Sequence, residues 1–237
     1  IIPMGKNHNK KIPLAVEYLE YLGTDKYSPA ELKQEFFRYG LTFGVFSGNE
    51  DAYVYISGLK KSLPKAFEIM EHMLANAKPD QEAYDKYVST ILKDRSNAKE
   101  DKNEILWGGM LNYGLYGEKS SFRNIIPEEE LREIDPTELT NLIKELYDYN
   151  HEIFYFGTRE FDEVKKLAKQ YHKVPAELKE SPEEKVYDIR AFDKSEVYFV
   201  DYDMVQSNIL FLSKDNKLDL NLLPYARTFN EFYGSGL

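Results

Sequence analysis

Histidine is the side chain on which a search for hydrolytic chemistry in this sequence depends. A zinc-peptidase signature places two histidines three or four residues apart on one helix, together with a glutamate that activates water. Only four histidines occur in the 237 residues, namely His8, His72, His151 and His172. No two of them have that spacing, so the residues alone do not indicate a zinc centre of this type.

Other catalytic motifs are also missing. Gly108 and Gly109 lack the spacing and the Lys-Ser/Thr partner of a phosphate-binding loop. The stretch Tyr233-Gly234-Ser235-Gly236 is not a Gly-x-Ser-x-Gly nucleophile elbow, and it is typical of a helix end. The carboxylates at 128–130 are typical of a solvated helix start, where they complement the helix dipole. These patterns give no catalytic residue.

Composition excludes several classes of partner. The formal net charge is −10, so the chain repels nucleic acid and anionic lipid. No apolar run approaches the roughly 20 residues of a membrane helix, and we expect no membrane insertion. The absence of cysteine fits a reducing cytosol or an export route, so the expected compartment, bacterial periplasm or cytoplasm, stays open. The 14% aromatic share fits ordinary core tyrosines or a wall that contacts peptides or a subunit.

The elements that would position any site are partly marked by capping residues. Ser28-Pro29-Ala30-Glu31 and Asp135-Pro136-Thr137-Glu138 each place a capping side chain before proline, with glutamate two residues after the proline. Alternation on both sides of a polar turn at 47–51 predicts a β-hairpin from residues 41–46 and 52–58. Apolar periodicity predicts further helices after residue 62, after residue 79, around 105–115 and after residue 158.

The last third of the chain predicts a domain boundary. An aromatic strand is expected at 151–156, and a polar, proline-bearing stretch then predicts a linker at 175–190. We therefore expect one domain at 1–174 and the incomplete start of a second at 191–237, with strands at 196–201 and 205–213 and a helix at 218–233. Ile1 is no initiator residue and Leu237 ends an apolar stretch, which favours a piece of a longer protein.

One ordered series of motifs carries a family resemblance. The stretch Leu14-Ala15-Val16-Glu17-Tyr18-Leu19-Glu20-Tyr21-Leu22-Gly23-Thr24-Asp25-Lys26-Tyr27 is followed by the capped helix to Gly40, the hairpin and Ser57-Gly58-Leu59. This order resembles the opening of a domain in the pitrilysin and insulinase family of zinc metallopeptidases, which includes the mitochondrial processing peptidases. The resemblance implies an α+β fold. Its sheet would be mixed but mostly antiparallel, with helices packed on one face, and the incomplete start of a second such domain would follow.

The resemblance also implies where catalytic residues would stand. In the family's catalytic domain, the helix before Gly-Thr carries His-x-x-Glu-His, in which two histidines bind zinc and the glutamate activates water. Aligning Gly23-Thr24 puts the two ligands at Leu14 and Tyr18 and the base at Glu17, while the third ligand falls near Asp94. We therefore expect no metal and no catalytic residue in this segment, which should be inactive alone. Zinc is expected in the catalytic domain of the full-length protein.

The rest of the resemblance suggests a role. Phe43, Gly44 and Val45 correspond to the family's substrate-facing edge strand, although Gly44-Val45 replaces the usual Asn-Ala pair. The stretch from Phe229 to Gly236 resembles the first helix and small-residue turn of a following domain. A zinc-less domain in this order is similar to the third domain plus the start of the fourth, in the noncatalytic C-terminal half. The fourth domain's transition-state Arg and Tyr would lie beyond residue 237.

Three functions are compatible with these patterns. The first is a segment of the noncatalytic half of a zinc metallopeptidase that completes a peptide-enclosing chamber, with the catalytic half and a peptide substrate as partners. The second is a separately encoded zinc-less partner, or a structural core subunit, of a processing-peptidase-like complex. The third is a peptide-binding or scaffold protein outside proteolysis. An upstream His-x-x-Glu-His in the same reading frame separates the first from the second.

Overall fold

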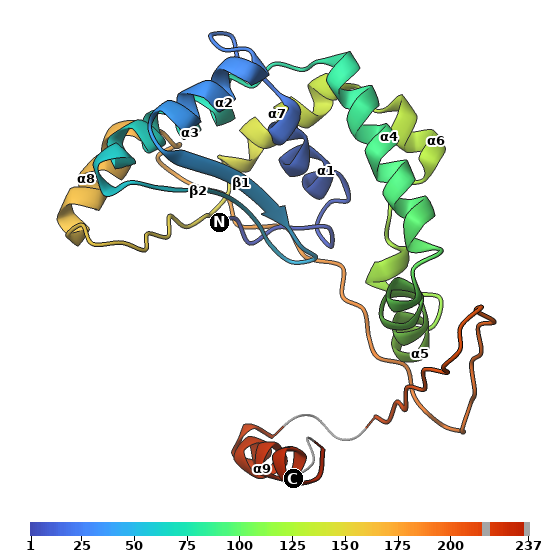
Figure 1. The fold of residues 1–237 in the computed structure, drawn as a ribbon. Coiled ribbons are helices and arrows are strands. Elements are labelled where there is room, and N and C mark those ends of the chain that lie inside the picture. Colours follow the sequence, from blue (N-terminus) through green and yellow to red (C-terminus); the bar gives the residue numbers. More distant parts are fainter. Residues whose placement is uncertain (215–218, 235–237) are drawn as a thin grey trace. The chain divides into compact units, whose positions relative to one another are not determined.

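A computed structural model describes residues 1–214 and 219–234, which fall into two compact units with a division after Asp188 (Figure 1). The first unit holds eight of the helices and both strands, and the second holds α9. The elements are α1 (Lys11–Tyr18), α2 (Pro29–Arg38), β1 (Leu41–Ser47), β2 (Ala52–Gly58), α3 (Leu63–Asn76), α4 (Gln81–Ala98), α5 (Leu111–Tyr116), α6 (Glu128–Glu133), α7 (Pro136–Leu146), α8 (Phe161–Tyr171) and α9 (Leu223–Gly234). A π-helical turn, Glu104–Met110, leads into α5.

The predicted hairpin and helix caps are present. β1 pairs antiparallel with β2, in a register that sets Leu41 opposite Gly58 and Ser47 opposite Ala52. Ser28 and Glu31 form a reciprocal capping box at the start of α2, and the Asp135 carboxylate accepts a hydrogen bond from the Thr137 N–H at the start of α7. Each cap satisfies a main-chain donor that the first helical turn leaves free.

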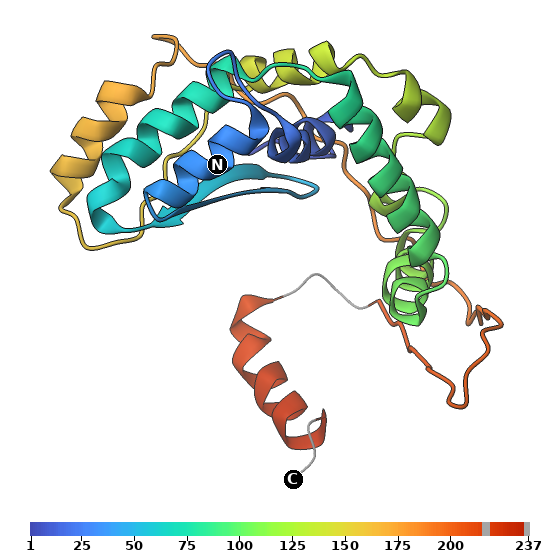
Figure 2. The same cartoon turned by 45° about the horizontal axis from the view of Figure 1, so that its top comes forward.

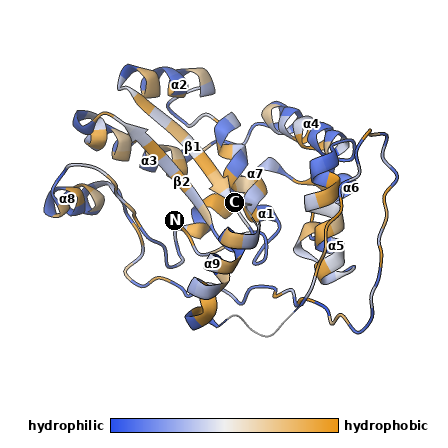
Figure 3. Ribbon diagram, turned by 60° about the horizontal axis from the view of Figure 1, so that its bottom comes forward, coloured by the Kyte–Doolittle hydropathy of each residue, from blue (hydrophilic) through white to orange (hydrophobic). Residues whose placement is uncertain are grey.

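Helices cover one face of the hairpin. Figure 2 shows α1, α2 and α3 on the same side of β1 and β2. The side chains that point toward these helices belong to alternate strand positions and pack into two apolar clusters. Hydrophobic residues are accordingly concentrated in α1 and β1 (Figure 3). The expectation of an α+β fold is thus confirmed, and within the described residues its sheet contains these two strands.

Three predicted strands are absent, and those predictions were wrong. Residues 151–156, 196–201 and 205–213 form no strand in the structure. Val197 is 94% exposed and Phe211 is 91% exposed, so these alternating apolar residues find no surface to cover. A strand needs the main-chain groups of a neighbour along its length, and among the described residues the main-chain pairing of 151–156 is confined to Glu152, which bonds to Ile1.

The second unit contains little regular structure. After residue 188, the described residues form one 3₁₀ turn, Leu220–Leu222, and α9. The helix predicted at 218–233 is present from residue 220 onward, whereas Leu218, Ser235 and Gly236 lie outside the described residues. The division after Asp188 falls inside the predicted linker, but the domain boundaries themselves stay a prediction. In the described parts of the chain, no helix has the length and apolar character to cross a bilayer.

Candidate functional site

Helix α1 holds the first candidate position in the core rather than at the surface. Leu14 is 6% exposed and packs in the main apolar cluster. Tyr18, four residues later on the same helix face, is fully buried. Glu17 lies between them in sequence and is exposed at the edge of that face. The structure therefore places Leu14 and Tyr18 on one buried face of α1.

The hydroxyl group of Tyr18 is used to anchor the next long helix. It donates a hydrogen bond to the Asp80 carbonyl oxygen at 2.6 Å and accepts one from the Asp80 N–H at 3.0 Å. Asp80 is the N-cap of α4, and its carboxylate accepts from the Ala83 N–H at 2.9 Å. Burial raises the pKa of Tyr18, so the phenol keeps its proton and both hydrogen bonds.

Glu17 is engaged by a tyrosine of α4. The Tyr87 hydroxyl donates to the Glu17 Oε2 atom at 2.7 Å. Burial first, and then the negative charge of Glu17, raise the pKa of Tyr87, so the proton stays on the phenol. One carboxylate oxygen is thus occupied by a fixed donor and is not free to take a proton from a water molecule.

Tyrosine rings fill the space around these two groups. Tyr18 lies edge-on to Tyr84 with ring centroids 5.5 Å apart, and it stacks on Tyr87 at 6.1 Å. The Tyr84 hydroxyl donates to the Leu131 carbonyl oxygen at 2.6 Å, and burial raises the pKa of Tyr84 to about 12. We call Tyr18, Tyr84 and Tyr87 the tyrosine cluster. Its hydroxyl groups are all committed to protein acceptors.

The second candidate site, at Phe43, Gly44 and Val45, lies in β1. Phe43 and Val45 pack toward the helices, whereas the Tyr55 phenol lies across Gly44 on the opposite face, in the space that a side chain at residue 44 would occupy. Along an antiparallel strand, the main-chain groups of successive residues face toward and away from the partner strand in turn. The Gly48 N–H bonds to Asp51 O, so every second residue back from Gly48 faces β2. The main-chain groups of Phe43 and Val45 therefore face away from β2. No main-chain group of the described residues bonds to this side of Phe43 and Val45, so β1 presents a free edge there.

An aromatic surface lies on the face of the hairpin that the helices leave uncovered. Phe46 stacks on Tyr53 at 4.9 Å, and Tyr55 follows at 6.2 Å from Tyr53. Phe46 is 46% exposed and Tyr55 is 48% exposed. We call these three residues the aromatic stripe. Exposed aromatic rings on a flat strand surface are suited to contact an extended peptide.

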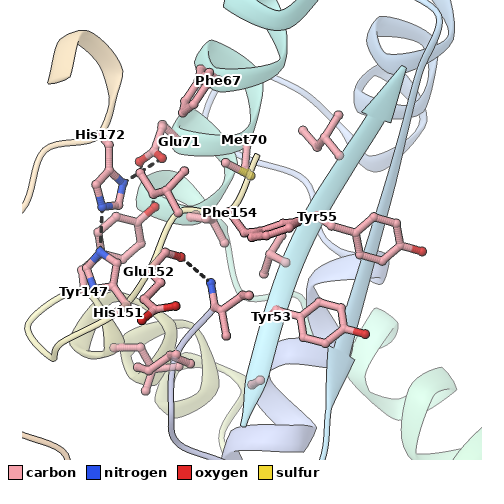
Figure 4. Close-up of a pocket in the computed structure, with 18 of the residues that line it drawn as sticks. Tyr53, Tyr55, Phe67, Met70, Glu71, Tyr147, His151, Glu152, Phe154 and His172 are labelled. Carbon is pink, nitrogen blue, oxygen red and sulfur yellow. Dashed lines mark hydrogen bonds and ion pairs between the residues drawn. The ribbon is translucent and has the colours of Figure 1, made fainter. Parts of the chain in front are cut away.

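A cavity of about 400 Å³ lies between β2, α3, α7 and residues 151–155 (Figure 4). One end of it is polar: His172 Nδ1 lies 2.9 Å from Glu71 Oε1, and the Tyr147 hydroxyl donates to Glu71 Oε2 at 2.9 Å. The Nε2 atoms of His151 and His172 are 2.7 Å apart, and His151 Nδ1 lies 2.6 Å from the Tyr149 carbonyl oxygen.

The acceptors around this histidine pair fix its protons. The Tyr149 carbonyl can only accept, so His151 Nδ1 carries a hydrogen, and the Glu71 carboxylate likewise receives the hydrogen of His172 Nδ1. A hydrogen on one of the two Nε2 atoms can bond to the other. Burial lowers the pKa of His151. The network ties the end of α8 to α3.

Comparison with known proteins identifies the fold family. Residues 15–125 match the model of the insulinase family, peptidase family M16. Residues 15–125 of this chain are thus similar to the M16 family. The resemblance found in the sequence is thus confirmed at the level of the family.

The curated relatives of this chain are much longer proteins. The β subunit of the mitochondrial processing peptidase of Neurospora crassa is 26% identical over 133 residues, which cover 56% of this chain and 28% of that protein. Subunit 1 of the Bos taurus cytochrome b-c1 complex is 23% identical over 132 residues, covering 56% of this chain and 28% of that protein. The chain therefore spans little more than a quarter of the curated relatives that it matches.

Solved structures show the same fold at low identity. The periplasmic protease PqqL of Escherichia coli matches with a TM-score of 0.62 at 10% identity, over 83% of this chain and 22% of that protein. An M16 peptidase inactive domain from Pseudomonas fluorescens matches with a TM-score of 0.50 at 15% identity, over 62% of this chain and 36% of that chain. These likenesses support the M16 fold.

The residues at the two positions that the sequence resemblance aligns with zinc ligands do not fit zinc. A leucine side chain has no donor atom, and the Tyr18 phenol keeps its proton because its oxygen is held between the Asp80 N–H and carbonyl groups. Across the described residues, no group of three or more His, Asp or Glu side chains is arranged to hold a metal ion. A metal ion bound at this helix therefore cannot take part in a chemical step.

Sequence reasoning did not find the residues that complete this site. Asp94, the position aligned with the third ligand, is exposed on α4, whereas Tyr87, seven residues earlier, is the α4 residue that reaches Glu17. Tyr84 and Tyr87 are three apart on a helix, which indicates a shared face but not what that face contacts. His151 and His172 are 21 residues apart, and no local pattern relates them.

Proposed function

We propose that this chain belongs to the noncatalytic half of a zinc metallopeptidase, where it forms part of the wall of a peptide-enclosing chamber. The proposal rests on what the side chains do at the three positions of α1 that align with the family's zinc motif. Leu14 is core, Tyr18 anchors α4 and Glu17 is held by Tyr87, so the helix that would carry the zinc motif is a structural element. Within the long type of family member, this domain is similar to the third, followed by the start of the fourth.

The hairpin supplies the surface that such a wall needs. Peptide bonds pair with a free strand edge through main-chain groups, and β1 offers those of Phe43 and Val45. The aromatic stripe beside this edge adds contact area for side chains of an extended peptide. A facing wall contributes by excluding water from the reacting bond, which requires no metal of its own.

Two measurements on the isolated chain test the noncatalytic part. Elemental analysis after dialysis should find no stoichiometric zinc, and the chain should not cleave an unfolded peptide. One tightly held zinc per chain, or cleavage that chelators abolish, would contradict the proposal.

The chamber role is tested in the full-length protein. Replacing Tyr55 with serine in the aromatic stripe should raise KM for a peptide substrate roughly fivefold, from the loss of about 1 kcal/mol of aromatic contact, with kcat nearly unchanged. Phe37 is the matched control, because it is an aromatic residue on α2 that is 87% exposed. Phe37→Ser should leave KM unchanged, and equal effects of the two substitutions would count against the stripe.

The second candidate function is a zinc-less partner or structural core subunit of a processing-peptidase-like complex. The observation that supports this role is the similarity to subunit 1 of the cytochrome b-c1 complex. Sequencing the reading frame discriminates between the two. An upstream His-x-x-Glu-His in the same polypeptide supports the first role, and its absence together with co-purification of a separate zinc-bearing chain supports the second.

A further inference from the structure

Two imidazole rings point their Nε2 atoms at each other at the polar end of the cavity. These atoms of His151 and His172 lie 2.7 Å apart, and the ring planes are 81° apart with centroids separated by 4.9 Å. Figure 4 shows both rings beside Tyr147 and Glu71. His151 lies between α7 and α8, whereas His172 directly follows α8, so tertiary structure brings the two nitrogens together.

The other nitrogen of each ring is held by an acceptor. His151 Nδ1 donates to the Tyr149 carbonyl oxygen at 2.6 Å, and His172 Nδ1 donates to Glu71 Oε1 at 2.9 Å. The second carboxylate oxygen of Glu71 accepts from the Tyr147 hydroxyl at 2.9 Å. Histidines that bind a metal almost always have a carbonyl or carboxylate partner on the far nitrogen, because it orients the ring and makes the other nitrogen a stronger electron donor.

These hydrogen bonds leave both Nε2 atoms without a hydrogen when the rings are neutral. A neutral imidazole carries one hydrogen, and here each Nδ1 atom already carries it. Two lone pairs then face each other across 2.7 Å and repel unless a cation lies between them. A proton is a costly cation here, because burial disfavours the charged ring of His151 and lowers its pKa. A metal ion bonds to both lone pairs and leaves both rings neutral.

We propose that His151 and His172 bind one divalent transition metal ion through their Nε2 atoms, with water molecules as the remaining ligands. Glu71 stays outside the coordination sphere, where its negative charge offsets that of the ion. Its side chain and that of His172 are only 12% and 14% exposed, so salt screens this attraction little. The described residues contain no group of three or more His, Asp or Glu side chains that could hold a metal, so the protein ligands are these two imidazoles.

The separation of the two nitrogens favours Cu²⁺ over Zn²⁺. With metal–nitrogen bonds of about 2.0 Å, two imidazoles at a right angle in a tetragonal complex have nitrogens about 2.8 Å apart, whereas a tetrahedral ion holds them about 3.3 Å apart. The observed 2.7 Å is close to the first value, so binding Cu²⁺ requires the rings to tilt but not to separate.

A site of this kind holds zinc weakly. Nitrogen ligands generally bind Cu²⁺ more strongly than Zn²⁺, and two imidazoles are fewer than the ligands of a structural zinc site. The expectation that the dialysed chain retains no stoichiometric zinc is therefore unchanged. The inference does not rest on the proposed function.

Titration of the chelator-treated chain with Cu²⁺ tests the site without any substitution. Cu²⁺ is paramagnetic and broadens the NMR signals of nearby protons. The ring signals of His151 and His172 should therefore disappear before one equivalent of copper is added. His8 is the internal control, because its ring lies in the loop before α1 and accepts a hydrogen bond from the Gly5 N–H. Its signals should persist at that ratio.

Variants then identify the ligands by calorimetric titration. Glu71→Gln removes the outer charge and should weaken Cu²⁺ binding about tenfold. His151→Gln and His172→Gln each remove a ligand and should weaken it more. His72→Gln is the matched control, because the His72 ring is directed at Thr24, with Nε2 3.0 Å from the hydroxyl oxygen, and it should leave the affinity unchanged. Circular dichroism establishes that each variant is folded before it is titrated.

Each outcome decides the question. Selective broadening of His151 and His172, with weaker binding in both ligand variants, supports the proposal. Broadening of His8 at the same copper ratio, or equal affinities of His151→Gln and His72→Gln, would show unselective binding to histidines and overturn it. Equal affinity of the chain for Cu²⁺ and Zn²⁺ would overturn the assignment of the metal. If a ligand variant does not fold, the NMR titration of the unchanged chain decides alone.

Discussion

Removing the Tyr18 hydroxyl should destabilise the first unit without disturbing its packing. Tyr18→Phe keeps the ring in the tyrosine cluster but leaves the Asp80 N–H and carbonyl without this partner. Each net hydrogen bond is worth about 1 kcal/mol, so the two together predict a loss of about 2 kcal/mol in the free energy of unfolding. For a unit of this size, that corresponds to a drop in Tm of about 4–8 °C.

Urea unfolding followed by far-ultraviolet circular dichroism measures this loss. Tyr21→Phe is the matched control, because the Tyr21 ring packs against Tyr87 with centroids 5.0 Å apart while its hydroxyl makes no hydrogen bond within the described residues. The control should change the free energy of unfolding by less than about 0.5 kcal/mol. If both substitutions cost the same, the hydroxyl of Tyr18 does not anchor α4 and the structural reading of this position fails.

Further predictions concern titration and metal binding. Tyr84 should ionise only near pH 12, above the ordinary tyrosine value of about 10, so Tyr84→Phe should remove part of the tyrosinate absorbance that appears near pH 12. The pKa of His151 in the folded protein is lowered, so its contribution to the free energy of unfolding is complete above the unfolded value of about 6.5 and is lost as the pH falls. In urea unfolding at several pH values, the free energy of unfolding of His151→Gln should depend less on pH than that of the unchanged protein. An equal dependence on pH would contradict the assignment. The double variant Leu14→His, Tyr18→His should unfold at lower urea and retain no stoichiometric zinc by elemental analysis, because a third ligand is missing. Retention of one zinc per chain would show that the site is better preserved than its hydrogen bonds indicate.

Elements that depend on contacts between residues close together in the sequence could be predicted. The Ser28–Glu31 capping box is a contact across three residues, and the Asp135 cap spans two. The hairpin follows from alternation around a short turn, and its register is closed by the same local chain. The helix that carries Leu14 and Tyr18 was expected from the family resemblance, and the structure places both residues on one buried face of it.

Features that depend on distant partners could not be predicted. Tyr18 meets Asp80 across 62 residues, and Tyr87 meets Glu17 across 70, and neither pair leaves a local pattern. Residues 151–156 have the composition of a strand, but composition specifies side-chain faces and not the neighbour whose main chain completes the ladder. Within the part of the chain that the structure describes, only Glu152 of this segment finds such a neighbour, in Ile1.

The double hydrogen bond of Tyr18 to Asp80 constrains how this helix could change during evolution. A histidine at residue 18 would remove the anchor of α4 at once, whereas a ligand pair would require a second histidine at Leu14 as well. Either histidine alone would lower the stability of the fold before a pair of imidazoles is present. Selection for stability by itself therefore favours keeping leucine and tyrosine at these two positions.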